Sequence, residues 1–440
     1  MIPELYVDHF KSKRVTVMGL GLLGRGIGDT AFLAECEADI IVTDMKSQEE
    51  LQAAVDTLAL HNDIVYHLGG HTMQDFEKRD FVLKASGVPY DSEYVEHATS
   101  NNIPVYMSAA LVSDIVMKAD MGVTIIGVTG TRGKSTVTQL IAHILRTSGH
   151  SVRLGGNIRG VANLPLLKEI EEGDFLVLEL DSWQLQGFGD LKISPNIAVF
   201  TSFMEDHMNY YKHDKERYFT DKAQIYRHQT EYDVLIASPQ AASEIIMREQ
   251  VAILIPESIH FEMKLIGEHN QVGARLAYEA VSQCGLSGEE IKAAIATFSP
   301  VEGRLEDIGM YRGIRVFNDN NATTADATIA ALQAINEEYN TKPIIIIGGT
   351  DKGLSIASLE QELLVGAKAC VFLEGTGTAR LNLSMSHLFA TLSECIEYAF
   401  SIVEEGDIIL FSPAFASFSS EFKNEYERND AFVNEMKKYT

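Results

Sequence analysis

The stretch GVTGTRGKSTVT, residues 127–138, has residue types and spacing suited to binding a polyphosphate. Gly130 and Gly133 let the backbone approach phosphate oxygens, and the first N–H groups of a following helix carry a positive partial charge. Lys134 can reach the β- and γ-phosphates of ATP, and the Ser135 hydroxyl can ligate Mg²⁺. We therefore predict a phosphate-binding loop formed by Gly130, Thr131, Arg132, Gly133, Lys134, Ser135 and Thr136.

This loop is a variant of the usual motif, because Val128 stands where that motif has its first glycine. The plain alternative is a glycine-bearing turn between a strand and a helix, with an incidental lysine. The apolar run before the loop and the helical pattern after it favour the phosphate-binding interpretation.

Polar side chains also follow the other apolar runs in this part of the chain. They are Asn157 after one run, Glu179, Asp181 and Ser182 after the next, and Glu205, Asp206 and His207 after a third. Ligands of open α/β sheets lie beyond the carboxyl ends of the strands. A carboxylate, an imidazole and a hydroxyl on neighbouring strand ends suit Mg²⁺ beside ATP. Each residue alone is more often solvated or caps a helix, so the prediction depends on their combination.

A second glycine motif, GLGLLG, lies near the N-terminus and supplies Gly19, Gly21 and Gly24. Asp44 follows about twenty residues later, after a second predicted strand. Alone, this pattern is typical of dinucleotide binding and raises the alternative of a nicotinamide- or flavin-dependent oxidoreductase. A tight turn without a ligand is a further alternative.

Three apolar runs in the last third of the chain end in polar loops, at residues 319–323, 348–352 and 412–417. In a parallel sheet these loops converge at one edge. The hydroxyls of Thr323 and Ser417 and the ammonium of Lys352 suit the carboxylates of an incoming amino acid. Helix capping by Asp319, Thr323 and Ser417 is the alternative.

The elements that must position these residues are strands alternating with helices. Strands are expected within residues 14–18, 38–44 and 81–84, then 123–129, 151–156, 174–180 and 196–203, and finally 314–320, 343–348, 368–374 and 407–412. This alternation predicts an α/β fold with three domains, each a mostly parallel, doubly wound sheet. We place the three domains at residues 1–120, 121–299 and 300–440. The first and last domains are expected to be Rossmann-like, and the central domain is expected to resemble a P-loop ATPase.

Composition excludes several classes of protein. Sixty-two carboxylates against 36 Lys and Arg, a net charge of −26, disfavour nucleic acid as a partner. No apolar run has the ~18–20 residues of a membrane span, and no secretory signal is recognisable. The four cysteines, scattered without a CxxC pair, argue for a reducing compartment and against structural zinc. We expect a cytoplasmic monomer.

The segments GTRGKST, LELDSWQLQ and FMEDHMNYY, in this order, resemble the Mur ligase family, the ATP-dependent amide-forming enzymes of peptidoglycan precursor synthesis. FTDKAQIYR resembles the family segment whose carbamylated lysine helps to hold a second Mg²⁺, which implies that role for Lys222. LIGEHN, VEGRLE and NDNNATTADAT likewise imply that Asn270, Arg304 and Asp319 lie on the ATP side.

The resemblance also implies substrates. The N-terminal domain would hold the UDP of a UDP-sugar, and the C-terminal segments resemble the D-glutamate-adding branch most. Implied contacts with the UDP-substrate are Leu22, Leu23, Gly24, Asp44, Ser86, Gly87, Asn157, Ser182 and His207, and those with the amino acid are Thr323, Lys352, Ser417 and Phe422. The chain departs from this branch at Asn321, usually lysine, at Asp181, commonly serine, and by an additional residue before Phe422.

The implied reaction joins glutamate to UDP-N-acetylmuramoyl-L-alanine through an acyl phosphate. Lys134, Glu179, His207 and Lys222 would be catalytic, with Ser135 and Glu179 on one Mg²⁺ and His207 and carbamylated Lys222 on the other. Other possibilities are the same chemistry with another amino acid, such as L-glutamate, a folylpolyglutamate synthase, and an ATP-binding switch without ligation.

Overall fold

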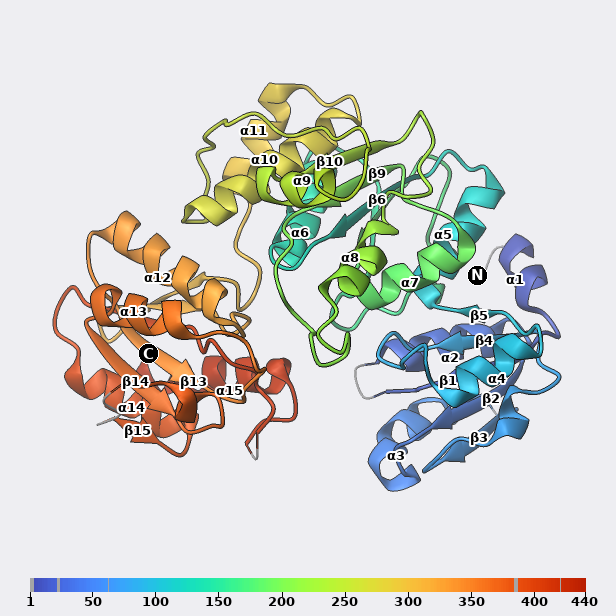
Figure 1. Cartoon of the computed structure of the whole chain (residues 1–440), viewed down its shortest axis with the longest axis horizontal. Coiled ribbons are helices and arrows are strands. Elements are labelled where there is room, and N and C mark those ends of the chain that lie inside the picture. Colours follow the sequence, from blue (N-terminus) through green and yellow to red (C-terminus); the bar gives the residue numbers. More distant parts are fainter. Residues whose placement is uncertain (1–3, 22–23, 62, 384–386, 420) are drawn as a thin grey trace. The chain divides into compact units, whose positions relative to one another are not determined.

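The computed structural model describes residues 4–21, 24–61, 63–383, 387–419 and 421–440. The chain forms two compact units, the first of residues 1–257 and 276–288 and the second of residues 258–275 and 289–440. The described residues form three sheets, two in the first unit and one in the second (Figure 1). Each of the three predicted domain ranges holds one sheet, while the exact boundaries stay predictions. Within the described residues, no helix is both long and apolar enough to cross a bilayer.

The first sheet is entirely parallel, with strand order β3-β2-β1-β4-β5. Its strands are β1 (Arg14–Met18), β2 (Asp39–Asp44), β3 (Ile64–Leu68), β4 (Phe81–Lys84) and β5 (Val105–Tyr106), and its helices are α1 (Glu4–Phe10), α2 (Arg25–Glu35), α3 (Gln48–Thr57), α4 (Glu93–Ser100) and α5 (Ser108–Ala119). The strand order reverses between β1 and β4, and such a switch point is where ligands of open α/β sheets bind.

The second sheet is also parallel, with order β10-β9-β6-β8-β7. Its strands are β6 (Thr124–Thr129), β7 (Val152–Gly156), β8 (Phe175–Glu179), β9 (Ile197–Phe200) and β10 (Val234–Ala237), and its helices are α6 (Lys134–Thr147), α7 (Ser182–Leu191), α8 (Lys215–Ala223) and α9 (Pro239–Ile246). The short apolar runs predicted as strands are confirmed here. β6, β8 and β9 are buried along almost their whole length because both faces of the sheet are covered, whereas the edge strand β7 includes the half-buried Arg153.

The third sheet has order β11-β12-β16-β13-β14-β15 and differs from the others in one strand. Its strands are β11 (Glu306–Tyr311), β12 (Ile314–Asn318), β13 (Ile344–Gly348), β14 (Ala369–Leu373), β15 (Leu388–Phe389) and β16 (Ile408–Phe411), and α10 (Glu268–Ser282) and α11 (Gly288–Thr297) precede them. The edge strand β11 runs antiparallel to β12, and the remaining pairs are parallel.

Helices cover both faces of the third sheet, as a doubly wound fold requires. Ile345 and Ile347 of β13 pack with α12 (Ala325–Tyr339) and α13 (Ala357–Gly366). Ile344 and Ile346 face the other way, toward α14 (Leu392–Ile402) and α15 (Glu425–Met436). Successive side chains of a strand point to opposite faces, so this isoleucine run fills two cores at once.

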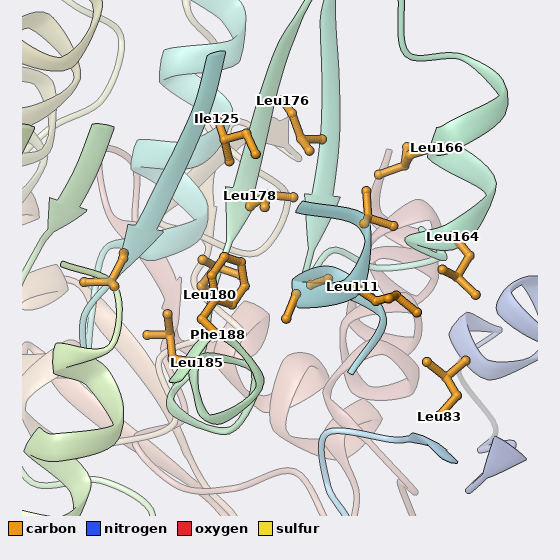
Figure 2. Close-up of a cluster of buried hydrophobic side chains, with 14 of the residues drawn as sticks. Leu83, Leu111, Ile125, Leu164, Leu166, Leu176, Leu178, Leu180, Leu185 and Phe188 are labelled. Atoms are coloured by element: carbon orange, nitrogen blue, oxygen red, sulfur yellow. The ribbon is translucent and has the colours of Figure 1, made fainter. Parts of the chain in front are cut away.

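One hydrophobic cluster joins the first two sheets within the first unit. Leu83 from β4 and Leu111 from α5 belong to the same buried cluster as Leu176 and Leu178 of β8 (Figure 2). Phe188 of α7 is fully buried in it. Because they share this core, the elements that carry the N-terminal glycine motif and those that carry the phosphate loop form one compact body.

Truncation of Leu178 should destabilise the first unit. Its side chain is 1% exposed, so Leu178→Ala should lower the free energy of unfolding by about 2–5 kcal/mol through lost burial and an unfilled cavity. Urea unfolding followed by fluorescence of the single tryptophan, Trp183 of α7, would measure this. The control Leu60→Ala removes a side chain that is 90% exposed and should change stability by no more than about 0.5 kcal/mol. Equal effects of both variants would contradict the described core.

Candidate active site

The loop between β6 and α6 requires glycine at two positions. Gly130 has φ +143° and Gly133 has φ +84°, values that other residues rarely adopt. A Cβ on Gly130 would lie 2.0 Å from Oγ1 of Thr201, well inside contact distance. The glycines predicted to admit phosphate are therefore also the residues that let this loop pack against the end of β9.

The residues after β9 hold the loop in place. The N–H of Thr131 donates to the Ser202 carbonyl at 2.7 Å, and the N–H of Arg132 donates to Ser202 Oγ at 2.9 Å. The Thr131 hydroxyl accepts from the Met204 N–H at 2.9 Å. These contacts fix the loop from the neighbouring strand, since β6 and β9 pair in parallel and end at the same edge.

Two lysines meet at one carbonyl of this loop. Lys134 Nζ donates to the Gly130 carbonyl at 3.0 Å, and Lys222 Nζ, from α8, donates to the same oxygen at 2.8 Å. Lys222 is 1% exposed. Burial, and next the positive charge of Lys134, hold the pKa of Lys222 well below its usual value. Lys222 is therefore not a surface lysine, although its polar stretch FTDKAQIYR would suggest one, and its lowered pKa allows the amine to be neutral.

The predicted metal ligands come from neighbouring strand ends. Glu179 is the buried last residue of β8, which pairs directly with β6. His207 follows β9, is exposed, has φ +56°, and its ring centroid lies 4.8 Å from that of Trp183. Among the described residues, no three His, Cys, Asp or Glu side chains group as a metal site. The donor set fits Mg²⁺ that takes its other oxygens from phosphates and water, as is usual for this ion.

Of three other residues predicted near this edge, Asp181 and Asp206 have structural partners and Ser182 is buried. Asp181 is the N-cap of α7, where its carboxylate accepts from the Gln184 N–H at 2.8 Å in a capping box. Asp206 forms an ion pair with Arg132 at 2.7 Å. Ser182 is buried at the first position of α7. Capping, the ordinary alternative, describes Asp181 well.

A cavity lies at the β1/β4 switch point of the first sheet. Its walls include Gly19, Gly21, Lys84, Ser86 and Arg25. Sequence reasoning predicted the glycines and Ser86 and missed both cations. Lys84 is a charge inside the apolar run FVLK and Arg25 directly follows the glycine turn, and both signals are visible in the sequence.

The buried Lys84 is held by the loop after β4. Its Nζ donates to the carbonyls of Val88 at 2.6 Å and Ala85 at 3.3 Å. Burial lowers its pKa to about 7. An anion in the cavity would therefore meet a lysine that can take up a proton in response.

The other described residues predicted to contact the UDP-substrate do not line this cavity, but four of them contact or neighbour residues that do. Asp44 is buried and accepts from the N–H groups of Gly21 at 3.2 Å and Lys46 at 2.9 Å, so it orders the glycine turn. Gly24, φ +83°, is the N-cap of α2. Asn157 Oδ1 accepts from Arg25 at 2.5 Å. Gly87 follows Ser86 in the loop after β4, while Leu22 and Leu23 lie outside the described residues.

The polar loops of the third sheet meet, as predicted. Lys352 Nζ donates to Oγ1 of Thr323 at 3.0 Å. The backbones of Thr350 and Ala416 exchange hydrogen bonds at 2.9 and 3.0 Å, which brings the loop that ends in Ser417 beside the loop that holds Lys352. Phe422 is buried in the apolar core of this unit.

Asp319 is not a helix cap, because α12 has Thr324 as its N-cap. Instead the buried Asp319 carboxylate accepts from the Leu305 N–H at 2.9 Å and from Ser412 Oγ at 2.8 Å. Burial raises its pKa to about 7, against the opposing charge of Arg304. Asn270 of α10 donates from its side chain to the Ile266 carbonyl at 2.8 Å. The ATP-side roles of these residues stay predictions.

Comparison with known proteins identifies two family domains in this chain. Residues 128–254 match the Mur ligase middle domain, and residues 303–415 match the Mur ligase glutamate ligase domain. A UDP-N-acetylmuramoylalanine--D-glutamate ligase of Roseiflexus sp. (strain RS-1) is 32% identical, over 97% of this chain and 99% of the relative. Proteins of the same name from Borreliella afzelii (strain PKo) and Geobacillus kaustophilus (strain HTA426) are 31% and 30% identical, over 97% and 100% of this chain and 98% and 100% of their own lengths.

Solved structures share the fold. UDP-N-acetylmuramate-alanine ligase MurC of Thermotoga maritima has a TM-score of 0.63 at 17% identity, covering 97% of this chain and 100% of its own. MurF ligase of Thermotoga maritima in complex with ADP has a TM-score of 0.62 at 13% identity, covering 99% of each chain. With two domain matches across more than half of the sequence and relatives above 30% identity over nearly its full length, this chain belongs to the Mur ligase family, the ATP-dependent ligases of peptidoglycan synthesis.

Proposed function

We propose that this chain joins D-glutamate to UDP-N-acetylmuramoyl-L-alanine in the cytoplasm, with conversion of ATP to ADP and phosphate. The convergence of Lys134 and Lys222 on the carbonyl of Gly130 carries the proposal, because it puts two nitrogen donors at a loop shaped for phosphate. The choice of substrates is supported by the names of the near-full-length relatives. A nicotinamide- or flavin-dependent oxidoreductase would not need a second phosphate-binding loop of this kind.

The proposal assigns the UDP part of the substrate to the cavity at the switch point of the first sheet. The glycine turn supplies backbone N–H groups at the start of α2, and Arg25 and Lys84 supply positive charge. Asp44 would accept a hydrogen bond from the uracil or ribose. The muramoyl-alanine end would then extend toward the edge of the second sheet, past Asn157 and Ser182.

In the first step, the terminal carboxylate of the UDP-substrate attacks the γ-phosphorus of ATP. A P–O bond forms to the substrate, and the bond to the leaving ADP oxygen breaks. Lys134 and the backbone N–H groups at the start of α6 offset the negative charge that gathers on the transferred group. Water must be kept from the acyl phosphate, since hydrolysis would waste it.

Mg²⁺ would be held by Ser135 and Glu179 at one position and by His207 and a carbamate of Lys222 at the other, where it would shield phosphate charge. A carbamate forms when a neutral amine adds to carbon dioxide and releases a proton. The environment of Lys222 suits that reaction, because burial favours the neutral amine. The resulting anion would lie beside the positive charge of Lys134.

In the second step, the amine of glutamate attacks the acyl carbon, phosphate leaves, and an amide forms. Thr323, Lys352, Ser417 and Phe422 are proposed to receive the amino acid. The contact between Lys352 and Thr323 supports a shared site for its carboxylates. The same chemistry with L-glutamate is the nearest alternative, since nothing in the side chains named here fixes the stereochemistry.

A substrate panel tests the proposed reaction directly. We expect purified protein with Mg²⁺ to release phosphate from ATP only when both UDP-N-acetylmuramoyl-L-alanine and D-glutamate are present. A panel of amino acids in both enantiomers, with products identified by mass, would identify the amino acid. Equal phosphate release with ATP alone would contradict a ligase.

Replacement of Lys222 tests the carbamate. Lys222→Ala should lose most activity, because one Mg²⁺ would lose a ligand, and should regain part of it with added acetate or another short-chain acid. Initial rates with and without acetate measure both effects. Lys212→Ala, which removes an exposed lysine paired with Asp91, serves as the matched control. It should keep the wild-type activity, and acetate should not alter its rate. Unchanged activity of the Lys222 variant would refute this role.

A further inference from the structure

The guanidinium of Arg428 is fully buried in the second unit. This residue belongs to α15, and its side chain is 0% exposed. Nε donates to Oδ1 of Asn320 at 2.8 Å, and Nη2 donates to the Asn320 carbonyl at 2.9 Å. Nη1 donates to the Phe415 carbonyl at 3.2 Å. Sequence reasoning gave this residue no role.

One guanidinium thereby donates hydrogen bonds to two of the three polar loops at the edge of the third sheet, the first and the last. Asn320 precedes Thr323 in the first loop, and Phe415 precedes Ser417 in the last. The middle loop also lies close, because a Cβ built on Gly349 would be 3.4 Å from Nη1 of Arg428. Thr323, Lys352 and Ser417, three of the four residues proposed to receive the amino acid, are therefore carried on loops that hydrogen-bond to Arg428 or lie close to it.

The hydrogen bonds of Arg428 go to neutral oxygens. Among the described residues no carboxylate forms an ion pair with it, and the negative charge of Glu425 acts only from a distance. Burial lowers its pKa to about 9, so it stays protonated at neutral pH. A buried charge without a counter-ion is costly, and an anion that binds nearby would reduce that cost.

We propose that Arg428 positions the three loops for the incoming amino acid and is the fixed positive charge that favours a dicarboxylic acid over its neutral amide. The inference rests on the proposed function and deepens it. Arg428 acts through Asn320 and Phe415 and lies close to Gly349, so it is a positioning residue and does not touch the substrate. The second carboxylate of the substrate supplies the negative charge that the described residues around Arg428 do not provide.

The test compares two variants of the full-length chain. Arg428→Gln removes the charge, and Arg428→Lys keeps it but loses the planar fork that reaches several acceptors. KM is measured for D-glutamate, ATP and the UDP-substrate, and kcat/KM is measured for D-glutamate and D-glutamine. The control is Arg312→Gln, which removes an exposed arginine of the same unit that stacks on Tyr439.

For Arg428→Gln we expect the KM for D-glutamate to rise at least tenfold, while the KM values for ATP and the UDP-substrate change less than twofold. The preference for D-glutamate over D-glutamine should fall at least fivefold. Arg428→Lys should keep most of this preference with a raised KM for D-glutamate, and Arg312→Gln should match the wild type. An equal loss of kcat/KM with both amino acids, or a parallel rise of all three KM values, would overturn the proposal.

If Arg428→Gln does not fold, as judged by circular dichroism, Arg428→Lys decides alone. Retained preference for the acid with a raised KM for D-glutamate supports the proposal, and a loss of that preference or an unchanged KM in a folded lysine variant overturns it. If the proposed function itself is wrong, the wild-type chain makes no product with glutamate. The Arg428 variants are then measured with the amino acid that the panel identifies. An amino acid with a neutral side chain would overturn the proposed role of Arg428.

Discussion

The carbonyl oxygen of Gly130 accepts hydrogen bonds from two lysine side chains, Lys134 and Lys222. The loop can adopt this conformation only with glycine at position 130, where a Cβ would collide with Thr201. Two nitrogens that carry or can carry positive charge are thus brought together in a mostly buried site. The reaction of this family uses ATP, whose phosphates would bring negative charge to both nitrogens.

The same principle applies at two further places in the chain. Lys84 is buried in the cavity of the first sheet, and Arg428 is buried beneath the polar loops of the third. Both are held by backbone carbonyls or an amide oxygen, with no carboxylate in direct contact among the described residues. The chain as a whole has a net charge of −26, so its average field repels anions. Local buried cations let an acidic protein select anionic substrates at defined positions.

Much of the fold could be predicted because its strands are buried on both faces. The runs around Val177 and Ile345 are apolar throughout, and the sequence shows them directly. β3 was missed because it is an edge strand with alternate residues exposed. The antiparallel edge strand β11 was missed for a similar reason, since its residues are mostly half-buried and it contains a bulge.

The candidate site could be predicted only where a residue's role is local. The glycines of the phosphate loop act through their own backbone, so their spacing identified them. Arg428 lies in the polar stretch EYERND, which reads as an exposed helix face. Its burial depends on Asn320, 108 residues earlier in the chain, and no local pattern contains that information. Lys222 likewise looks like a surface lysine until α8 brings it to the carbonyl of Gly130.

The choice between lysine and arginine at these buried positions follows from what each group can become. Burial leaves Lys222 able to lose its proton, and a neutral amine can be modified covalently. Arg428 is buried as deeply, yet with a pKa of about 9 its guanidinium keeps its charge at neutral pH. A lysine therefore suits the place where a carbamate is proposed to form, and an arginine suits the place where a permanent charge must select a carboxylate. At position 428 a lysine would keep the charge but lose the planar fork that reaches several acceptors, and at position 222 an arginine would not offer an amine that can form a carbamate.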